Sequence, residues 1–343
     1  MSSPNQLTLL GADVSSLQRA EDLGAKYFDE TGQAGDPLQI LKDHGVNTIR
    51  LRVWVDPASG YNNQAKVAAF AAKVKAMGFK LLIDFHYSDT WADPGKQFTP
   101  AAWAGHSLDQ LETDVYQHTT SVCEALKAAH ATPDMVQVGN EINNGMLWPT
   151  GRAENWDNLA GLLKQGIKAV RDCSPTTQVM LHIANAGDDL GARLWYDAAQ
   201  SRGVEWDIIG LSYYSYWHGS MADMSHTVSD LKTRFGKPVV IVETAYPFTL
   251  EEGDDEPNVI HLAGQLTSGY EASPSGQAAN LRDVMNAARS GGAAGVFYWE
   301  PTWTAVKGNG WDPAEPASGD QWENQALFDY TGKALPALSE FKP

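Results

Sequence analysis

Short apolar runs alternate with longer amphipathic stretches along almost the whole chain. Eight runs have the length and apolar content of buried strands, and these are Leu7–Asp13, Asn47–Val55, Lys80–Ser88, Met135–Glu141, Gln178–Ala184, Ile208–Tyr214, Pro238–Thr244 and Gly295–Pro301. Between them, apolar residues recur at helical spacing in Asp36–His44, Gln64–Met77, Leu108–Ala129, Trp156–Asp172, Leu190–Arg202, Met221–Phe235 and Ser275–Ser290. Eight strand-then-helix units predict an α/β fold in which a parallel sheet closes as a (β/α)8 TIM barrel.

The length of the chain and the position of its loops agree with one barrel. A barrel of this class can take up all 343 residues, so we expect a single domain over residues 1–343. The longest predicted loops, Tyr87–Ala104, Tyr246–Pro274 and Thr302–Gln325, each follow a strand. Loops at the carboxyl ends of barrel strands build the active-site face, so these loops predict a substrate groove.

Alternation within the strands predicts a charged upper barrel. Successive strand side chains point to opposite faces, and the apolar face of each strand should meet the helices. The residues then left to point inward include Asp13, Arg50, Arg52, Trp54, Asp84, His86, Gln137, Glu141, Ser212 and Tyr214. A core that only stabilised the fold would not bury so many ionisable groups, so this interior predicts a functional site.

Two glutamates, Glu141 and Glu243, end the fourth and seventh strand runs. Cleavage of a glycosidic bond needs one carboxylic acid to protonate the leaving oxygen and one carboxylate on the other side of the anomeric carbon. An arginine beside the second group would keep it ionised, and Arg50 and Arg52 are the candidates. The pair therefore predicts a retaining glycosidase if the two carboxyl groups lie about 5–5.5 Å apart.

Other polar residues near the strand ends leave alternatives open. Asp13, Asp84 and Glu300 are further carboxylates, and Asp84 with His86 has an Asp-x-His spacing that metal-dependent hydrolases also use. No His-x-His accompanies it, so we interpret Asp84 and His86 as a hydrogen-bonded orienting pair. Strict alternation sends Asn140 outward, and only a bulge at the strand end would bring it into the site.

Composition narrows the choice of partners. With 25 basic and 42 acidic side chains, the chain has a net charge of −17, which repels nucleic acid and anionic membranes, and a neutral substrate fits this charge. The chain has 12 tryptophans and 12 tyrosines, and many lie in polar, Gly- and Pro-rich stretches, where flat rings suit sugar binding. There is no apolar run long enough to span a membrane.

The termini and the two cysteines bear on the compartment. Residues Met1–Gln6 lack the basic region and apolar stretch of a signal peptide, so either the protein is cytoplasmic or a signal was removed and Met1 was introduced for expression. Cys123 and Cys173 lie in predicted helices, and we expect two buried thiols, with a disulfide between neighbouring helices as the alternative.

An acidic loop follows the seventh strand. Oxygen-bearing side chains stand at every second position, at Glu252, Asp254, Glu256 and Asn258. Calcium takes six to eight oxygen ligands, so the loop is a candidate calcium site. A solvated acidic loop on an acidic protein explains the same composition.

Several of these stretches together resemble a known family. GADVSSL (11–17), GVNTIRLRVWVDP (45–57), DFHYSDTWADPGKQ (84–97), VQVGNEINNGMLWP (136–149), DIIGLSYYSYWHG (207–219), VVIVETAYP (239–247) and GVFYWEP (295–301) are similar to the arabinogalactan endo-β-1,4-galactanases of glycoside hydrolase family 53. The resemblance covers nearly the whole chain. It implies a retaining barrel enzyme that cuts β-1,4-galactosidic bonds in the (arabino)galactan side chains of pectin.

The resemblance also implies roles for single residues. Glu141 would be the acid/base, Glu243 the nucleophile, and Asn140 the residue that binds the sugar 2-hydroxyl. Tyr214 would orient the nucleophile, Trp299 would lie under the cleaved sugar, and an inward arginine, Arg50 or Arg52, would stand beside Glu243. Trp91, Trp217, Trp303, Trp311 and Trp322 are candidate sugar platforms, and Asp13, Asp84 and His86 complete the expected binding site.

Further expectations follow from the same resemblance. Bacterial members have a calcium site of the pattern Asp-x-Asp-x-His-x-Asn, whose spacing the loop Glu252–Asn258 matches with two different ligand types. Catalysis should need no cofactor, and we expect a monomer. Because the substrate is a polymer, we expect the enzyme to be secreted, at the cell surface or periplasmic. The rival predictions are a related enzyme acting on another β-1,4-glycan such as mannan, and a barrel that binds galactan without cutting it.

Overall fold

The computed structural model describes residues 5–343 and is built around a closed barrel of parallel strands. In spatial order the barrel strands are β1 (Leu9–Asp13), β10 (Gly295–Trp299), β9 (Val239–Glu243), β8 (Ile208–Ser212), β7 (Gln178–Ile183), β6 (Met135–Val138), β5 (Lys80–Phe85) and β4 (Thr48–Val53), which pairs with β1 again. Apart from the closure between β1 and β10, each barrel strand pairs with the next barrel strand along the chain, as repeated right-handed βα units require. The predicted (β/α)8 TIM barrel is confirmed.

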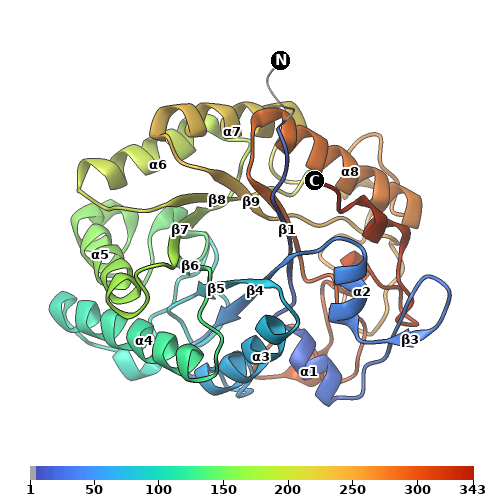
Figure 1. Cartoon of the computed structure of the whole chain (residues 1–343), viewed down its shortest axis with the longest axis horizontal. Helices are drawn as coiled ribbons and strands as arrows, with labels where there is room; N and C mark the ends of the chain where they lie inside the picture. The colour runs from blue at the N-terminus through green and yellow to red at the C-terminus, as the bar shows by residue number, and fades with distance from the viewer. Residues whose placement is uncertain (1–4) are drawn as a thin grey trace.

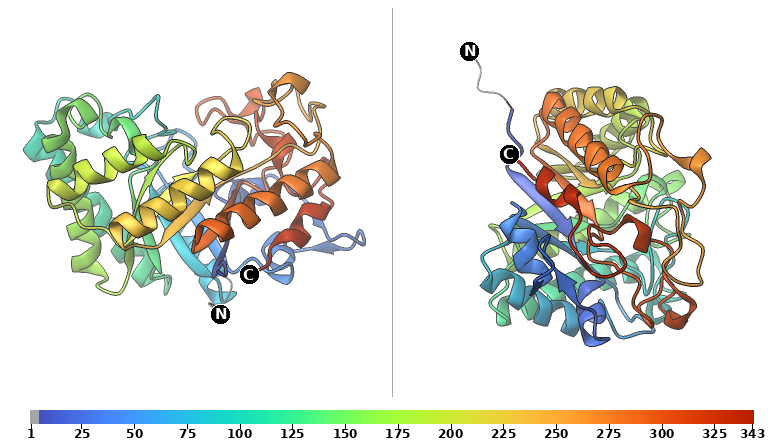
Figure 2. Two further views of the ribbon diagram at one scale, coloured as in Figure 1. Left: turned by 90° about the horizontal axis from the view of Figure 1, so that it is seen from above. Right: turned by 90° about the vertical axis from the view of Figure 1, so that its right-hand side faces the viewer.

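Helices surround this barrel on the outside (Figure 1). They are α1 (Leu17–Asp22), α2 (Pro37–Asp43), α3 (Gln64–Ala76), α4 (Leu108–Ala128), α5 (Trp156–Cys173), α6 (Asp189–Ser201), α7 (Met221–Phe235) and α8 (Pro274–Gly291). Short 3-10 helices lie at Ala101–Trp103, Ile142–Asn144, Ala153–Asn155, Ala263–Gln265, Pro316–Ser318, Glu323–Gln325 and Pro336–Glu340. A small hairpin, β2 (Tyr27–Phe28) with β3 (Ala34–Gly35), projects beside α2 (Figures 1 and 2).

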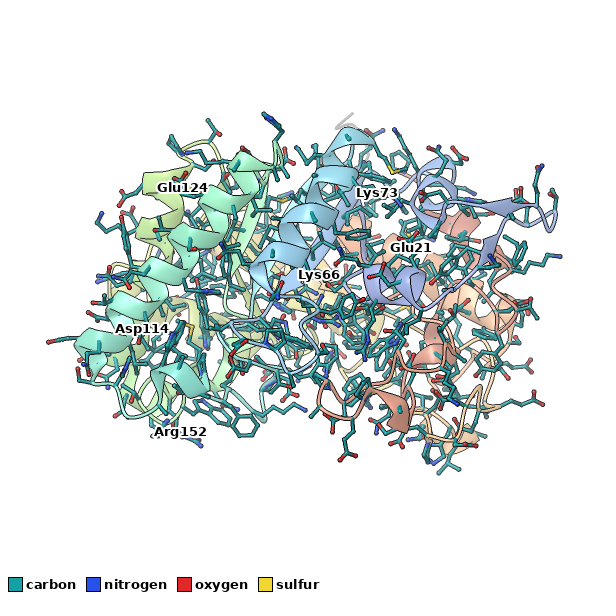
Figure 3. The ribbon with its side chains drawn as sticks, turned by 90° about the horizontal axis from the view of Figure 1, so that it is seen from below. Glu21, Lys66, Lys73, Asp114, Glu124 and Arg152 are labelled. Atoms are coloured by element: carbon teal, nitrogen blue, oxygen red, sulfur yellow. A yellow bond between two sulfur atoms is a disulfide. The ribbon has the colours of Figure 1, made fainter. Side chains whose placement is uncertain are left out.

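The sequence explains where most of the helices begin. Asp36, Asn63, Ser107, Ser220 and Ser273 each accept a backbone N–H in the first turn of the helix that follows. The short helix α1 and the hairpin β2–β3 were not predicted, because neither is long enough to show a periodic pattern. Lys73 of α3 lies 3.6 Å from Glu21, which ties the unpredicted α1 to its neighbour (Figure 3).

Apolar side chains close the lower end of the barrel. Leu9, Leu82, Met135, Met180, Ile208, Val240, Val242 and Phe297 form this inner cluster, separate from the layer between strands and helices. The ring of Phe297 lies against Gly11 of the neighbouring strand β1, where a Cβ atom would lie 2.3 Å from the ring. This end of the barrel interior is therefore filled by side chains.

Most strands end one to three residues earlier than predicted. Beyond the last paired residue the backbone leaves the sheet, with positive φ values at Tyr87 (50°), Glu141 (48°) and Glu300 (57°). Non-glycine residues adopt this conformation at a cost and concentrate at functional sites. The polar ends of the predicted strands therefore belong to the loops of the active-site face.

A disulfide joins Cys123 of α4 to Cys173 at the end of α5, with the Cα atoms 6.4 Å apart. The expectation of two free buried thiols is wrong. The two helices run side by side, as Figure 1 shows, and this brings the cysteines within bonding distance although 50 positions separate them in the sequence.

Of the helices in residues 5–343, none is both long enough and apolar enough to cross a membrane. The expectation that the first residues are not a signal peptide concerns mainly residues 1–4, which lie outside the described part of the chain.

Candidate active site

The carboxyl ends of the strands surround a cavity of about 310 Å³. Thirteen of the fifteen catalytic and substrate-binding residues predicted from the sequence line it, namely Asp13, Arg52, Asp84, His86, Trp91, Asn140, Glu141, Tyr214, Trp217, Glu243, Trp299, Trp311 and Trp322. The other two, Arg50 and Trp303, lie behind the cavity wall. The lining is mostly aromatic, with the charged groups gathered at the bottom, which is typical of a site for a neutral polar ligand.

Glu141 and Glu243 face each other across this cavity. A carboxylate oxygen of Glu141, one of Glu243 and a ring nitrogen of His182 all lie within 4.8 Å of one another. Such a separation leaves no room for a water molecule and a sugar ring between the carboxyl groups. It fits a covalent, retaining mechanism and not an inverting one.

A bulge turns Glu243 into the cavity. In β9, Val240 and Val242 belong to the inner apolar cluster, so strict alternation would point Glu243 toward the helices. The register between β8 and β9 shifts at this point, since Leu211 pairs with Ile241 but Ser212 pairs with Glu243. The extra residue reverses the side-chain direction, as bulges near active sites commonly do.

A second break in alternation brings Asn140 inward together with Glu141. Gly139 follows the end of β6 with φ of 87°, and a Cβ atom there would lie 2.7 Å from Ile142 Cγ2. The Asn140 side chain accepts a hydrogen bond from Arg50 Nη2 at 2.9 Å and donates one to the carbonyl of Ala92 at 2.8 Å. The left-handed glycine therefore does what a bulge was expected to do, and Asn140 lies in the site.

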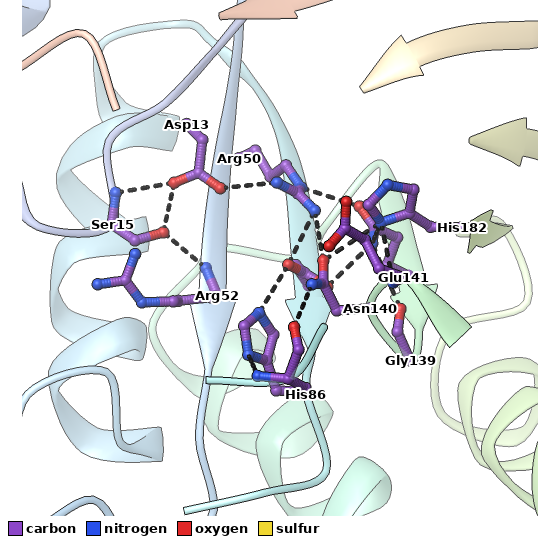
Figure 4. Close-up of polar contacts among 12 residues, drawn as sticks. Asp13, Ser15, Arg50, Arg52, His86, Gly139, Asn140, Glu141 and His182 are labelled. Carbon is purple, nitrogen blue, oxygen red and sulfur yellow. Dashed lines mark hydrogen bonds and ion pairs between the residues drawn. The ribbon is translucent and has the colours of Figure 1, made fainter. Parts of the chain in front are cut away.

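Arg50 is the arginine beside Glu243. Figure 4 shows its contacts with Asp13 and Asn140. Its guanidinium is fully buried and reaches Glu243 Oε1 at 2.8 Å, Asp13 Oδ2 at 3.0 Å and Asp84 Oδ2 at 2.9 Å. Burial alone would lower the pKa of Arg50, but the charges of Asp84, Glu243 and Asp13 outweigh it and raise the pKa. Arg50 is therefore a permanent cation under the cavity.

Arg52 has a different partner. Its Nη1 donates to Glu300 Oε1 at 2.5 Å, and its guanidinium lies over the rings of Trp91 and Trp54, 4.2 and 4.9 Å from their centroids. Glu300 also accepts from the Ser16 hydroxyl, and burial raises the pKa of Glu300 to about 7 although Arg52 opposes the rise. The choice that the sequence left open between the two arginines thus falls on Arg50.

The two catalytic candidates are electrostatically unequal. Burial, followed by the charge of Glu243, raises the pKa of Glu141 well above its usual 4.5. Burial also raises the pKa of Glu243, but the ion pair with Arg50 and a 2.8 Å hydrogen bond from the Tyr214 hydroxyl act against this rise. A proton shared by the pair therefore resides on Glu141, and Glu243 stays ionised.

Aromatic rings form most of the cavity wall. Trp91 stacks on Trp311 with centroids 4.8 Å apart, and Trp299 meets Trp322 edge to face at 4.8 Å. Trp217 is 51% exposed at the rim, which leaves its face open to a sugar. The prediction of Trp303 as a sugar platform is wrong, because Trp303 is 1% exposed and stacks behind Trp311, 5.5 Å away.

Hydrogen bonds to the two histidines of the cavity floor, His86 and His182, argue against a metal ion bound by either of them. His86 Nδ1 accepts from the Trp54 indole at 3.0 Å and from the amide of Ala92 at 3.2 Å, and its Nε2 faces Asp84 at 3.2 Å. Both nitrogens are occupied, so the pair Asp84–His86 orients neighbouring groups, as expected. In the same way, both ring nitrogens of His182, beside Glu141 and Glu243, are engaged by protein groups.

Sequence reasoning missed His182 as a site residue, and gave no role to Ser212 and Gln137. His182 is fully buried, and it contacts Gln137 Nε2 at 2.9 Å and Ser212 Oγ at 2.7 Å. Ser212 in turn donates to Glu141 Oε1 at 2.7 Å. The signal was available, because alternation in β7 puts Val179 and Leu181 against the helices and His182 inside.

The loop Glu252–Asn258 is bound to the loop after β10. Asp254 Oδ2 accepts from the amide of Asp320 at 2.8 Å, and Glu323 Oε1 accepts from the amide of Gly253 at 2.9 Å. Three buried oxygens in this cluster have no hydrogen-bond partner in the described chain, namely Asn258 Oδ1, Asp320 Oδ2 and Glu323 Oε2. Glu252 Oε2 accepts from the backbone N–H and the side-chain amide of Asn258, whereas Glu256 Oε1 accepts from Gln321 at 2.7 Å, so Glu252 and Asn258 meet and Glu256 is held by the loop after β10.

Comparison with known proteins agrees with this site. The family model described as glycosyl hydrolase family 53 matches residues 9–341. An arabinogalactan endo-beta-1,4-galactanase from Cellvibrio japonicus is 39% identical over 349 residues, covering 97% of this chain and 90% of that protein. The solved GH53 catalytic domain from Ignisphaera aggregans superposes with a TM-score of 0.94 at 43% identity, covering 99% of this chain and 96% of that one. A fungal beta-1,4-galactanase structure gives 0.84 at 34% identity, with 98% and 99% covered.

Proposed function

On the premise that this chain belongs to glycosyl hydrolase family 53, we propose how its residues hydrolyse β-1,4-galactosidic bonds inside galactan chains. The enzyme is a retaining glycoside hydrolase. The observation that carries the assignment of roles is the pair Glu141 and Glu243, with oxygens within 4.8 Å and unequal surroundings. Glu141 is the acid/base, and Glu243 is the nucleophile.

In the first step, Glu243 attacks the anomeric carbon while Glu141 gives its proton to the glycosidic oxygen. The bond between the anomeric carbon and that oxygen breaks, the shortened chain leaves as an alcohol, and a galactosyl ester of Glu243 remains. Arg50 and the Tyr214 hydroxyl hold the two oxygens of Glu243, each at 2.8 Å, so that a carboxylate is present and correctly turned. The bonds to these donors also keep the nucleophile ionised.

In the second step, Glu141 acts as a base. It takes a proton from water, the water oxygen attacks the anomeric carbon, and the ester bond to Glu243 breaks with the original configuration restored. Asn140, fixed by Arg50, binds the sugar 2-hydroxyl, where hydrogen bonds strengthen in the transition state. Trp299 forms the floor under the sugar that is cleaved.

The aromatic wall binds the rest of the polymer. Trp91, Trp311 and Trp322 offer faces and edges to the sugars in the cavity, and the exposed Trp217 offers a face at the rim. Asp13, Asp84 and His86 keep the polar floor in place. Binding energy from these remote contacts distorts the sugar at the catalytic centre.

A time course on linear β-1,4-galactan tests the substrate and the endo mode together. Reducing ends should appear while long products are still abundant, and mannan should stay intact under the same conditions. Cleavage of mannan in preference to galactan would favour the rival prediction, a related enzyme that acts on another β-1,4-glycan. The Glu243→Gln variant tests the second rival: turnover should vanish while galactan binding persists, whereas a mere binding protein would show no turnover in either form.

A structural calcium ion at the loop after β9 is a further part of the proposal. The buried oxygens of Asn258, Asp320 and Glu323 lack partners, and Asp254 lies beside them, which is the all-oxygen donor set that calcium requires. Glu252 already contacts Asn258, whereas Glu256, which accepts from Gln321, would have to turn. Dialysis against EDTA should lower the melting temperature, and calcium but not magnesium should restore it. An unchanged melting temperature would refute the calcium site.

We also propose that the enzyme is a secreted monomer that degrades pectic galactan. The disulfide between Cys123 and Cys173 supports an oxidising compartment, since such bonds seldom persist in the cytosol. A polymer too large to enter a cell also requires the enzyme to meet it outside. Light scattering checks the monomer, and free-thiol titration of the native protein checks the disulfide.

A further inference from the structure

We propose that a chain of hydrogen bonds from Arg50 through Gln137, His182 and Ser212 fixes the catalytic proton of Glu141 on its Oε2 atom. The inference rests on the proposed role of Glu141 as acid/base. Ser212 and His182 are positioning residues in this account, because neither touches the substrate. Each link has only one direction that satisfies its donors and acceptors.

The chain starts at a group that can only donate. Arg50 Nε donates to Gln137 Oε1 at 2.9 Å, which fixes the orientation of the Gln137 amide. Its nitrogen then faces Asp84 Oδ1 and His182 Nδ1, both at 2.9 Å. Asp84 is paired with Arg50 and is an acceptor, so the same orientation suits both ends of the amide.

The amide of Gln137 determines the tautomer of His182. Nδ1 receives the N–H of Gln137 and faces the backbone N–H of Glu141 at 3.4 Å, so it carries a lone pair. Asn140 Oδ1 lies 3.2 Å from Nδ1 and could accept a hydrogen bond from it. A hydrogen on Nδ1 would gain that one bond, but it would also face the N–H groups of Gln137 and Glu141, which are donors. Burial, followed by the charge of Arg50, lowers the pKa of His182 well below its usual 6.5, which favours the neutral ring.

The neutral ring must therefore carry its hydrogen on Nε2. This atom lies 2.7 Å from Ser212 Oγ and donates to it. The hydroxyl of Ser212 has one hydrogen, which it donates to Glu141 Oε1 at 2.7 Å. Glu141 Oε1 is thus always an acceptor.

The acid proton then has one place left. Within residues 5–343, Glu141 Oε2 has no hydrogen-bond partner, and Glu141 lines the cavity. A proton on Oε2 points into the cleft where the glycosidic oxygen arrives. When Glu141 later acts as a base, the same atom takes the proton of water while Ser212 keeps its bond to Oε1. The nucleophile and the acid therefore share one cation, Arg50, that orients both.

Nuclear magnetic resonance of the ¹⁵N-histidine-labelled enzyme tests the chain without reference to activity. Long-range ¹H–¹⁵N correlations should show His182 with a protonated Nε2 and a bare Nδ1. The opposite tautomer, or a doubly protonated ring near neutral pH, would overturn the proposal. If wild-type enzyme did not cleave galactan, the proposed function would fail, but this measurement would still decide the direction of the chain.

Kinetics of Ser212 variants provide the second test. In Ser212→Ala the carboxylate form of Glu141 loses a donor, so the alkaline limb of kcat/KM should move upward by about one pH unit, with about a tenfold loss on galactan. The loss should shrink on a galactoside whose leaving group is dinitrophenol, which departs without a proton. Ser212→Thr, which keeps the hydroxyl, should restore the wild-type limb. An unchanged limb in Ser212→Ala, or an equal loss on both substrates, would overturn the positioning role.

Discussion

Replacing Tyr214 by Phe tests the electrostatic account of the nucleophile most directly. The Tyr214 hydroxyl donates to Glu243 Oε2 at 2.8 Å, while Arg50 holds the other oxygen. The exchange removes one donor from the ionised form of Glu243 and changes little of the packing. Since that donor favours the carboxylate, its loss raises the pKa of Glu243.

The size of the effect follows from the bond that is lost. A hydrogen bond to a charged group is worth about 1.5–3 kcal/mol, and one pKa unit corresponds to about 1.36 kcal/mol. The acidic limb of kcat/KM, which reports the ionisation of the nucleophile in the free enzyme, should therefore move upward by about one to two pH units. Well below that limb, activity on galactan should fall about 10- to 100-fold, while the loss near the optimum is smaller.

The assay is a pH series of initial rates on linear galactan for wild type, Tyr214→Phe and Tyr213→Phe. Tyr213 is the matched control, because its ring is buried against the helices and its hydroxyl donates to the carbonyl of Gly219 at 2.9 Å, away from both carboxylates. Tyr213→Phe should keep the wild-type pH profile. If Tyr214→Phe also kept it, the argument that hydrogen bonding keeps Glu243 ionised would be refuted.

Four further outcomes follow from the structure. Glu141→Gln should lose about 10²- to 10⁴-fold on galactan but much less on dinitrophenyl galactosides, and equal losses on both would exclude Glu141 as the acid. Arg50→Met should lower the free energy of unfolding by about 3–5 kcal/mol in a urea titration, because it leaves Asp13, Asp84 and Glu243 buried without a cation, and a change below 1 kcal/mol would contradict this. The double exchange Cys123→Ser, Cys173→Ser should cost up to about 4 kcal/mol, the loop-closure value for a separation of 50 residues, and an unchanged urea midpoint would argue against the disulfide. Trp217→Ala should raise KM for galactan without changing the melting temperature, whereas Trp303→Ala should lower the melting temperature, and the reverse pattern would invalidate the assignment of exposed and buried rings.

The barrel and most of the site could be predicted from the chain because periodicity acts locally. Alternation in β4 and β5 is enough to turn Arg50, Arg52, Asp84 and His86 inward, and the structure places all four as expected. Helix boundaries were predicted closely where a capping residue precedes an amphipathic run, as Ser220 does before α7.

The remaining features depend on contacts that periodicity does not encode. The bulge that turns Glu243 inward is set by the register between β8 and β9, and the inward turn of Asn140 depends on the left-handed Gly139. Whether Trp303 meets a sugar or another ring depends on how the loop after β10 folds over Trp311. The Cys123–Cys173 bond depends on how α4 packs against α5.

Because three carboxylates surround Arg50, the enzyme could be converted from one that cuts galactan into one that synthesises it. If Glu243 is exchanged for Ser or Gly, the guanidinium of Arg50 still has two carboxylate partners, Asp13 and Asp84, so the buried cation is not left unpaired. Glu141 would remain available to activate an incoming sugar hydroxyl. Supplied with galactosyl fluoride of the α configuration, such a barrel becomes a scaffold for glycosynthesis, joining galactose units into the linkage that the parent enzyme removes.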